Sequence, residues 1–175
     1  MPKLALRRSL RLVGTGLPRL WAAARSTGAS TSQSTDALLA SALAFSRAAA
    51  ESPRQWRRQN AVRHFIWQAY LAARHGETLA RALGDAQEQG SGDQVDTRVD
   101  QENNTLGRAW GLAHAEELRS GTRAEVLERL VAVADRKWHD EELSAAPLPD
   151  GSDPRRAPGR GSARRRRRSG ARPPR

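Results

Sequence analysis

The chain contains no cysteine among its 175 residues. This absence excludes disulfide bonds, thiolate zinc sites and thiol catalysis. The chain also has no run of 18 apolar residues, so the sequence predicts no transmembrane helix. No segment alternates between apolar and polar residues as a half-buried strand does. Helices are therefore the elements that we expect.

Acidic residues are absent from one end of the chain and scarce at the other. Residues 1–35 carry six basic and no acidic residues, and residues 143–175 carry ten arginines against two aspartates. Residues 36–142 carry 14 basic and 17 acidic residues, so the formal net charge of +11 belongs to the two ends. A nucleic-acid-binding domain needs its basic residues on a folded face, and the middle of this chain is mildly acidic.

These shifts in composition predict three parts. Residues 1–35 form a basic amphipathic segment that ends in a polar linker at 26–35, residues 36–142 form a helical domain, and residues 143–175 form a disordered tail rich in Arg, Pro and Gly. Residues 1–25 fit a helix on a membrane surface, a cleaved signal or a disordered tail. Because Arg19 interrupts a short hydrophobic region, a cytoplasmic or peripheral membrane location is favoured over secretion.

Capping residues and apolar periodicity in the middle part predict a compact all-α bundle of about five helices. Ser52 followed by Pro53 is typical of a helix start, Gly76 of a helix end, and Thr122 with Glu125 of a capping box. The predicted helices run from about 36 to 51, from 53 to 75, from 77 to 89, from 97 to 115, and from 123 onward.

The fourth predicted helix carries a face of small and polar residues. They recur at steps of four and three, at Asp100, Asn104, Gly107, Gly111 and His114. Another helix can approach such a face closely and bring side chains to Asp100 and Asn104. Asparagine inside a helix costs roughly 0.5 kcal/mol relative to alanine, so the pair Asn103 and Asn104 needs a reason. That reason is either a buried amide that ties helices together or a functional site.

Helix geometry limits which residues can share a site. Asp100 and Asn104 lie about 6 Å apart along one face and can act together, whereas Asp100 and His114 lie about 21 Å apart and cannot. His64 lies among apolar and aromatic residues and is either a core histidine or a ligand. Glu88 falls in the last turn of its helix, where the helix dipole disfavours a negative charge that a nearby cation would stabilise.

Several of these residues stand together in a pattern that resembles an uncharacterised bacterial all-helical domain family, a domain of unknown function. The family pattern reads RHxxW, then a glycine, then DAHE, then MDxxNNxxG. In this chain it corresponds to Arg63-His64, Trp67, Gly76, Asp85-Ala86-Gln87-Glu88, and Asp100 to Gly107. Gln87 stands where the pattern has histidine, and Val99 where it has methionine. If the family site is a metal hydrolase, the resemblance implies that Gln87 weakens metal binding here.

Two functional hypotheses follow. In the first, an interhelical site hydrolyses a phosphoester or ester. Glu88 or Asp100 acts there as a general base or as a ligand of a divalent metal, magnesium or manganese rather than zinc, and His64 is a second ligand or an acid. Asn104 is an orienting donor and Asn103 a binding residue. In the second, the helical domain is a non-catalytic interaction domain. Nucleic acid or an anionic membrane is then bound by the run Arg164, Arg165, Arg166, Arg167 and Arg168.

Overall fold

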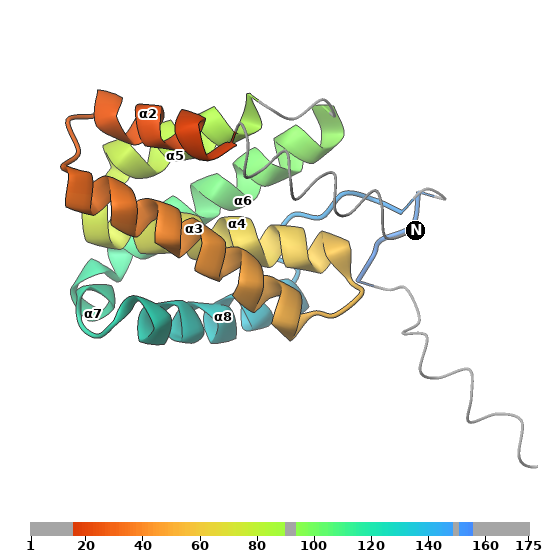
Figure 1. Cartoon of the computed structure of the whole chain (residues 1–175). Helices are drawn as coiled ribbons and strands as arrows, with labels where there is room; N and C mark the ends of the chain where they lie inside the picture. Colours follow the sequence, from red (N-terminus) through yellow and green to blue (C-terminus); the bar gives the residue numbers. More distant parts are fainter. Residues whose placement is uncertain (1–15, 90–93, 149–150, 156–175) are drawn as a thin grey trace, which may run out of the picture.

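A computed structural model describes residues 16–89, 94–148 and 151–155, and these residues form seven helices without a strand (Figure 1). The all-α prediction is confirmed, with seven helices in this part of the chain rather than about five. The helices are α2 (Leu17–Ser26), α3 (Thr31–Glu51), α4 (Trp56–His75), α5 (Glu77–Glu88), α6 (Gln94–Ala113), α7 (Ala115–Arg119) and α8 (Arg123–His139). None of the described helices is long and apolar enough to cross a membrane.

Helix α4 is the centre of the fold. It contacts α3, α5, α6, α7 and α8, and from Ala61 to Ala73 every residue except Arg63 is buried. A helix surrounded in this way is expected to be apolar on all sides. Most of α4 follows that rule, but His64 and Gln68 are fully buried as well. The helices α2 and α5 lie side by side along one edge, and α8 runs along the opposite edge (Figure 1).

The first two helices differ from the sequence prediction. The helix expected from about residue 36 begins at Thr31, because Ser30 caps it: the Ser30 side chain accepts a hydrogen bond from the Gln33 backbone, and the Gln33 side chain accepts one from the Ser30 backbone. Half of the predicted linker is therefore helical. Helix α2 buries Leu20 beside α5, so part of the predicted basic segment belongs to the fold, while residues 1–15 lie outside the described residues.

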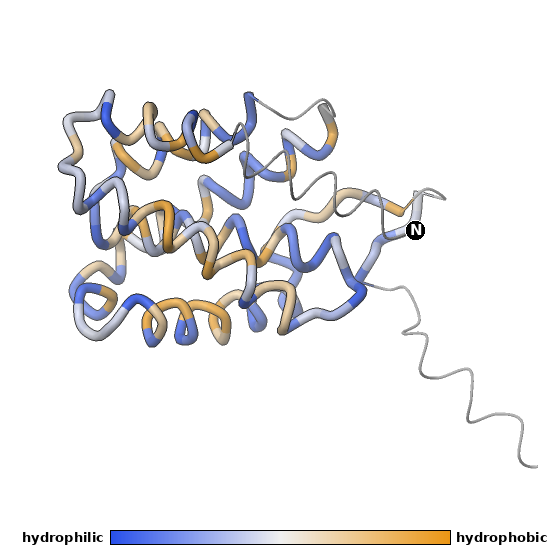
Figure 2. The backbone as a smooth tube through the Cα atoms, in the orientation of Figure 1, coloured by the Kyte–Doolittle hydropathy of each residue, from blue (hydrophilic) through white to orange (hydrophobic). Residues whose placement is uncertain are grey.

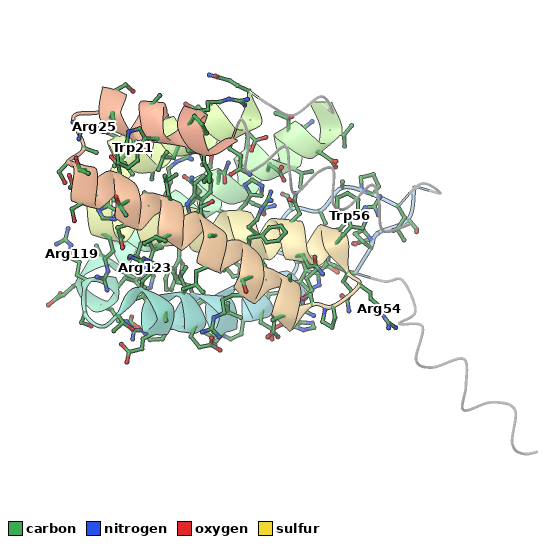
Figure 3. The ribbon with its side chains drawn as sticks, in the orientation of Figure 1. Trp21, Arg25, Arg54, Trp56, Arg119 and Arg123 are labelled. Atoms are coloured by element: carbon green, nitrogen blue, oxygen red, sulfur yellow. The ribbon has the colours of Figure 1, made fainter. Side chains whose placement is uncertain are left out.

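The predicted start of the second helix was wrong by three residues. Ser52 ends α3 instead of opening α4: its N–H donates to Ala48, and its carbonyl accepts from Gln55 at 3.1 Å. Arg54 follows with a φ of 70°, and α4 begins at Trp56. Figure 3 labels both residues at this end of the bundle. The predicted end is confirmed, since Gly76 has a φ of 89° that few other residues adopt.

The later helices follow the prediction more closely. Helix α6 begins at Gln94, three residues earlier than expected, and it ends at Ala113, so that α7 is a separate short helix. The capping box of Thr122 and Glu125 opens α8 as predicted. Blue and orange alternate turn by turn along α8 in Figure 2, as expected of a helix with one buried face. That buried face contains Val126, Leu127, Leu130, Val131 and Ala134.

The sequence predicted that the chain leaves the fold at Leu143, but the structure keeps Leu143 within the fold. Leu143 is fully buried, and Arg155 donates to its carbonyl at 2.8 Å. Asn103 on α6 holds the same segment through two hydrogen bonds with the Ser144 backbone. These contacts supply the apolar burial and hydrogen bonds that composition alone did not reveal. The arginine run from 164 to 168 lies outside the described residues.

Candidate metal centre

The candidate site lies along the contact between α4 and α6. Three side-chain hydrogen bonds join these helices, and in each of them the partners are 40 residues apart. A constant offset means that the two helices run parallel and in register, since an antiparallel pair would keep a constant sum instead. We call the six residues the polar ladder; its rungs are Asn60 with Asp100, His64 with Asn104, and Gln68 with Arg108.

Two glycines of α6 bring the helices close enough for these rungs. A Cβ atom on Gly107 would lie 2.5 Å from the carbonyl oxygen of Phe65, and one on Gly111 would lie 2.2 Å from that of Ala69. Both distances are far below van der Waals contact, so no other residue fits without moving a helix. The predicted close approach of a second helix to this face of α6 is therefore confirmed, and α4 is the helix that approaches.

His64 is fully buried and bonded through both ring nitrogens. Its Nε2 accepts from the Arg63 guanidinium at 2.5 Å, because a guanidinium can only donate. The hydrogen of the neutral ring therefore sits on Nδ1, which donates to Oδ1 of Asn104 at 2.9 Å. Nδ1 is therefore fixed by an acceptor, as it is in many metal-binding histidines, while the lone pair of Nε2 is taken by Arg63.

Two carboxylates, those of Asp100 and Glu88, lie close to the imidazole of His64. Asp100 accepts from Asn60 through Oδ1 and places Oδ2 3.2 Å from Nε2 of His64. Glu88, on the last turn of α5, is 8% exposed, and its Oε1 is buried without a hydrogen-bond partner among the described residues. The site thus combines three acceptors: one imidazole lone pair and two carboxylates.

The electrostatics of the site favour a neutral histidine and disfavour an ionised Glu88. Burial lowers the pKa of His64, and the charge of Arg63 lowers it further, although Asp100 and Asn104 oppose the shift. Burial raises the pKa of Glu88 to about 7, and the negative charge of Asp100 adds to this effect. Arg63 only partly compensates. More positive charge would therefore be accommodated at this point.

The size of the site suits one metal ion. One ligand atom each from His64, Glu88 and Asp100 lies within 4.8 Å of the others. Ligands on opposite sides of a transition-metal or magnesium ion are separated by about 4.0 to 4.4 Å, since each bond is about 2.0–2.2 Å long. Only two of the three atoms can lie on opposite sides of one ion, so the side chains would have to move closer together to coordinate it.

The other predicted residues are distributed differently. Asn104 lies in the site, but Asn103 faces the opposite way and holds Ser144. His75 bonds to Asp36 at the far end of α4 and is not part of the site of His64. His114 stacks on Trp110, with 3.8 Å between ring centroids.

Sequence reasoning missed Asn60, which orients Asp100, and gave Arg63 no role although it stands in the family pattern. A signal for Asn60 was present: it precedes His64 by one helical turn, as His64 precedes Gln68. The same four-residue period recurs in Asp100, Asn104 and Arg108. Aligning the two periods would have suggested the pairing of Asn60 with Asp100.

Comparison with protein families places the chain clearly. It belongs to the family described as Domain of unknown function (DUF6973), which matches residues 27–135. The match begins before α3 and ends within α8, so it includes every residue of the polar ladder and Glu88. No curated protein and no solved structure matches the chain.

Proposed function

We propose that this domain binds one divalent cation, manganese or magnesium, through His64, Glu88 and Asp100, and uses it in a hydrolase-like reaction on a phosphoester or ester. The buried Oε1 of Glu88 carries the proposal, since it has no partner among the described residues. An unpartnered buried carboxylate oxygen costs more than about 1–3 kcal/mol, so it calls for an explanation, such as a bound ion or water. A cation between the three ligand atoms would provide the missing partner.

The contact of His64 with Asp100 supports the same proposal. Because Nε2 of His64 accepts from Arg63, no hydrogen lies between Nε2 and Oδ2 of Asp100, which are 3.2 Å apart. Two electron-rich atoms at this distance with no hydrogen between them repel unless positive charge lies nearby. Arg63 supplies some of that charge, and a divalent ion would supply more.

The ligand set determines which ions fit. Two carboxylates and one imidazole suit manganese or magnesium, whereas the softer thiolate sites that favour zinc are excluded by the lack of cysteine. Gln87 is half-buried, and the three ligand atoms converge without it. The chain therefore offers three protein ligands, and the remaining positions are left to water and substrate.

The side chains divide the work of hydrolysis between them. A cation held by His64, Glu88 and Asp100 would supply Lewis-acid polarisation of a substrate oxygen. Asn104 keeps His64 in the tautomer that presents Nε2, and Asn60 orients Asp100. The apolar residues around α4 limit the access of bulk water, which strengthens each electrostatic interaction in the site.

A thermal-shift screen of the full chain against divalent ions tests the proposal. We expect manganese or magnesium to raise the melting temperature by about 5 °C or more at a hundredfold excess over the dissociation constant. The substitutions Asp100→Asn and Glu88→Gln should each abolish that shift. Asp85→Asn is the matched control, because Asp85 is an exposed carboxylate on the same helix as Glu88.

The outcomes separate the metal site from a purely structural role. If no divalent ion shifts the melting temperature of the wild type, the metal proposal is wrong and the polar ladder is a device for helix pairing. If the shift persists in both Asp100→Asn and Glu88→Gln, the ion binds elsewhere. Only an ion-dependent shift that survives Asp85→Asn and is lost in the two site variants agrees with the proposal.

A further inference from the structure

Two unpartnered groups of opposite character lie in the same site. Oε1 of Glu88 is a buried acceptor, and Nε of Arg63 is a buried donor; neither has a hydrogen-bond partner within the described part of the chain. The charges of the two residues interact, yet the groups form no ion pair. A cation alone would leave the Arg63 N–H unpaired, and an anion alone would leave the Glu88 oxygen unpaired. A cation and an anion together would complete both.

Arg63 stands where a metal would take the histidine. Its Nη2 donates to Nε2 of His64 and, at 2.7 Å, to Oδ1 of Asn60. The lone pair on Nε2 can serve either the guanidinium or a metal ion, but not both. Every other residue from Ala61 to Ala73 is buried, whereas Arg63 as a whole is half-buried, although its Nε is buried.

We propose that Arg63 is the oxyanion-binding residue of this site: a divalent ion takes the His64 lone pair, and the released guanidinium binds the oxygens of a phosphoryl group that also contacts the ion. This inference rests on the proposed metal site. Two carboxylates, one guanidinium and one divalent ion leave a net positive charge, which favours an anionic ligand. The planar guanidinium fits two phosphoryl oxygens at once, which a lysine cannot do.

The proposal predicts that manganese and phosphate bind cooperatively and that Arg63 mediates the coupling. Manganese binding to the full chain would be titrated with and without inorganic phosphate, with free ion read by electron paramagnetic resonance. We expect phosphate to tighten manganese binding about tenfold in the wild type and less than about twofold in Arg63→Ala. Without phosphate, Arg63→Ala should bind manganese several-fold more tightly, because a competing cation is gone.

Two further variants separate a specific role from a change in charge or folding. Arg81→Ala removes an exposed arginine that pairs with Glu77 on α5 and should behave as the wild type. Arg63→Lys keeps the charge but not the fork, so it should retain weak manganese binding and lose most of the phosphate effect. Far-ultraviolet circular dichroism of each variant confirms that the helices are intact.

The possible failures point to different conclusions. If manganese binds but phosphate tightens it equally in the wild type and in Arg63→Ala, the role of Arg63 is refuted and the metal site stands. If acetate tightens binding as much as phosphate, the phosphoryl assignment is refuted. If manganese binds to neither protein, the metal site and the role of Arg63 fall together.

Discussion

Helix α4 carries two clusters in which a histidine meets an aspartate, and their hydrogen bonding differs. At the end of α4, both oxygens of Asp36 are used: Tyr70 donates at 2.8 Å, His75 lies at 2.8 Å, and Arg123 donates through Nε at 2.8 Å. Each charge there has a partner. Figure 3 labels Arg123 at this end of the bundle, opposite to Arg54 and Trp56.

The candidate site of Arg63, His64, Glu88 and Asp100, nearer the start of α4, is incomplete by comparison. Within the described residues Glu88 keeps one oxygen unpartnered, Arg63 keeps one N–H unpartnered, and Nε2 of His64 lies 3.2 Å from Oδ2 of Asp100. Similar residue types therefore serve two purposes on one helix. A complete cluster fixes helices in place, and an incomplete one leaves capacity for a ligand.

The two clusters also differ in the direction of their pKa shifts. Burial acts to raise the pKa of Asp36, but the hydrogen bonds from Tyr70, His75 and Arg123 outweigh it, and the pKa is lowered. Burial and Asp100 raise the pKa of Glu88 to about 7. Ionisation thus stabilises the fold at Asp36 and destabilises it at Glu88, which makes the comparison testable by mutation.

The largest expected loss of stability comes from disturbing the close contact between α4 and α6, on which the polar ladder depends. Gly111→Ala should lower the free energy of unfolding by about 3 kcal/mol or more, because its Cβ would lie 2.2 Å from the carbonyl oxygen of Ala69. Chemical denaturation measures this loss. Gly16→Ala is the control, since nothing lies within 4 Å of the added atom, and it should leave stability nearly unchanged. Equal effects in both variants would contradict close helix approach.

The second largest loss of stability is expected from replacing Asp36, the carboxylate that Tyr70, His75 and Arg123 share. Asp36→Ala leaves Tyr70, His75 and Arg123 without their shared acceptor, and we expect a loss of about 2–3 kcal/mol at pH 7. Because the folded-state pKa of Asp36 is below its ordinary 3.8, its contribution in the wild type is lost as the pH falls through that region. Metal-induced shifts in melting temperature should be unaffected; their loss would show that the clusters are coupled.

Removing the carboxylate of Glu88 should raise the free energy of unfolding instead of lowering it. Glu88 has a pKa of about 7 in the folded protein against an ordinary 4.5, so the folded state holds its proton more tightly. Stability should therefore fall as the pH rises from about 4.5 to 7. Without divalent ions, Glu88→Gln should be more stable than the wild type by about 1–3 kcal/mol at pH 8 and should lack this dependence.

That comparison needs two pH values and one matched variant. Denaturation at pH 5 and pH 8 separates the titration of Glu88 from a general change in packing. Glu116→Gln, at an exposed position on α7, controls for removal of a negative charge, since Asp85 itself raises the pKa of Glu88. If Glu88→Gln were destabilising at pH 8, Glu88 would already have a favourable partner in the folded protein.

The smallest expected effect is the loss of one hydrogen bond from the complete cluster. Tyr70→Phe removes the hydroxyl that donates to Asp36 at 2.8 Å but keeps the buried ring. We expect a loss of about 1 kcal/mol, since His75 and Arg123 still bind the carboxylate. Thermal denaturation at neutral pH measures it. A loss as large as that of Asp36→Ala would indicate that Tyr70 organises the whole cluster.

Local sequence signals predicted much of the fold. The capping box of Thr122, the stop at Gly76 and the small face of α6 depend on residues within one or two turns of each other, and the structure agrees with all three. The start of α4 was misplaced for a physical reason. Ser52 can cap either the helix before it or the one after it, and only packing decides which.

The candidate site was only partly predictable. The four-residue period placed Asp100 and Asn104 on one face, but the partner of that face depends on how α4 and α6 lie in space, which is a long-range property. The adjacent asparagines illustrate the limit. Successive helical residues point about 100° apart, so Asn103 and Asn104 had to face different neighbours. Nothing local indicated that one would face His64 and the other Ser144.

The constant offset between α4 and α6 determines the sequence pattern that the same site would require in another protein. Each helix contributes three residues of the polar ladder at steps of four, Asn60-x3-His64-x3-Gln68 on α4 and Asp100-x3-Asn104-x3-Arg108 on α6. An insertion inside either ladder would rotate every later rung by about 100° per residue. An insertion between α5 and α6 would change the value of the offset and leave all three rungs aligned. The sequence pattern of the site is therefore two motifs of fixed internal spacing, joined by a segment whose length can vary.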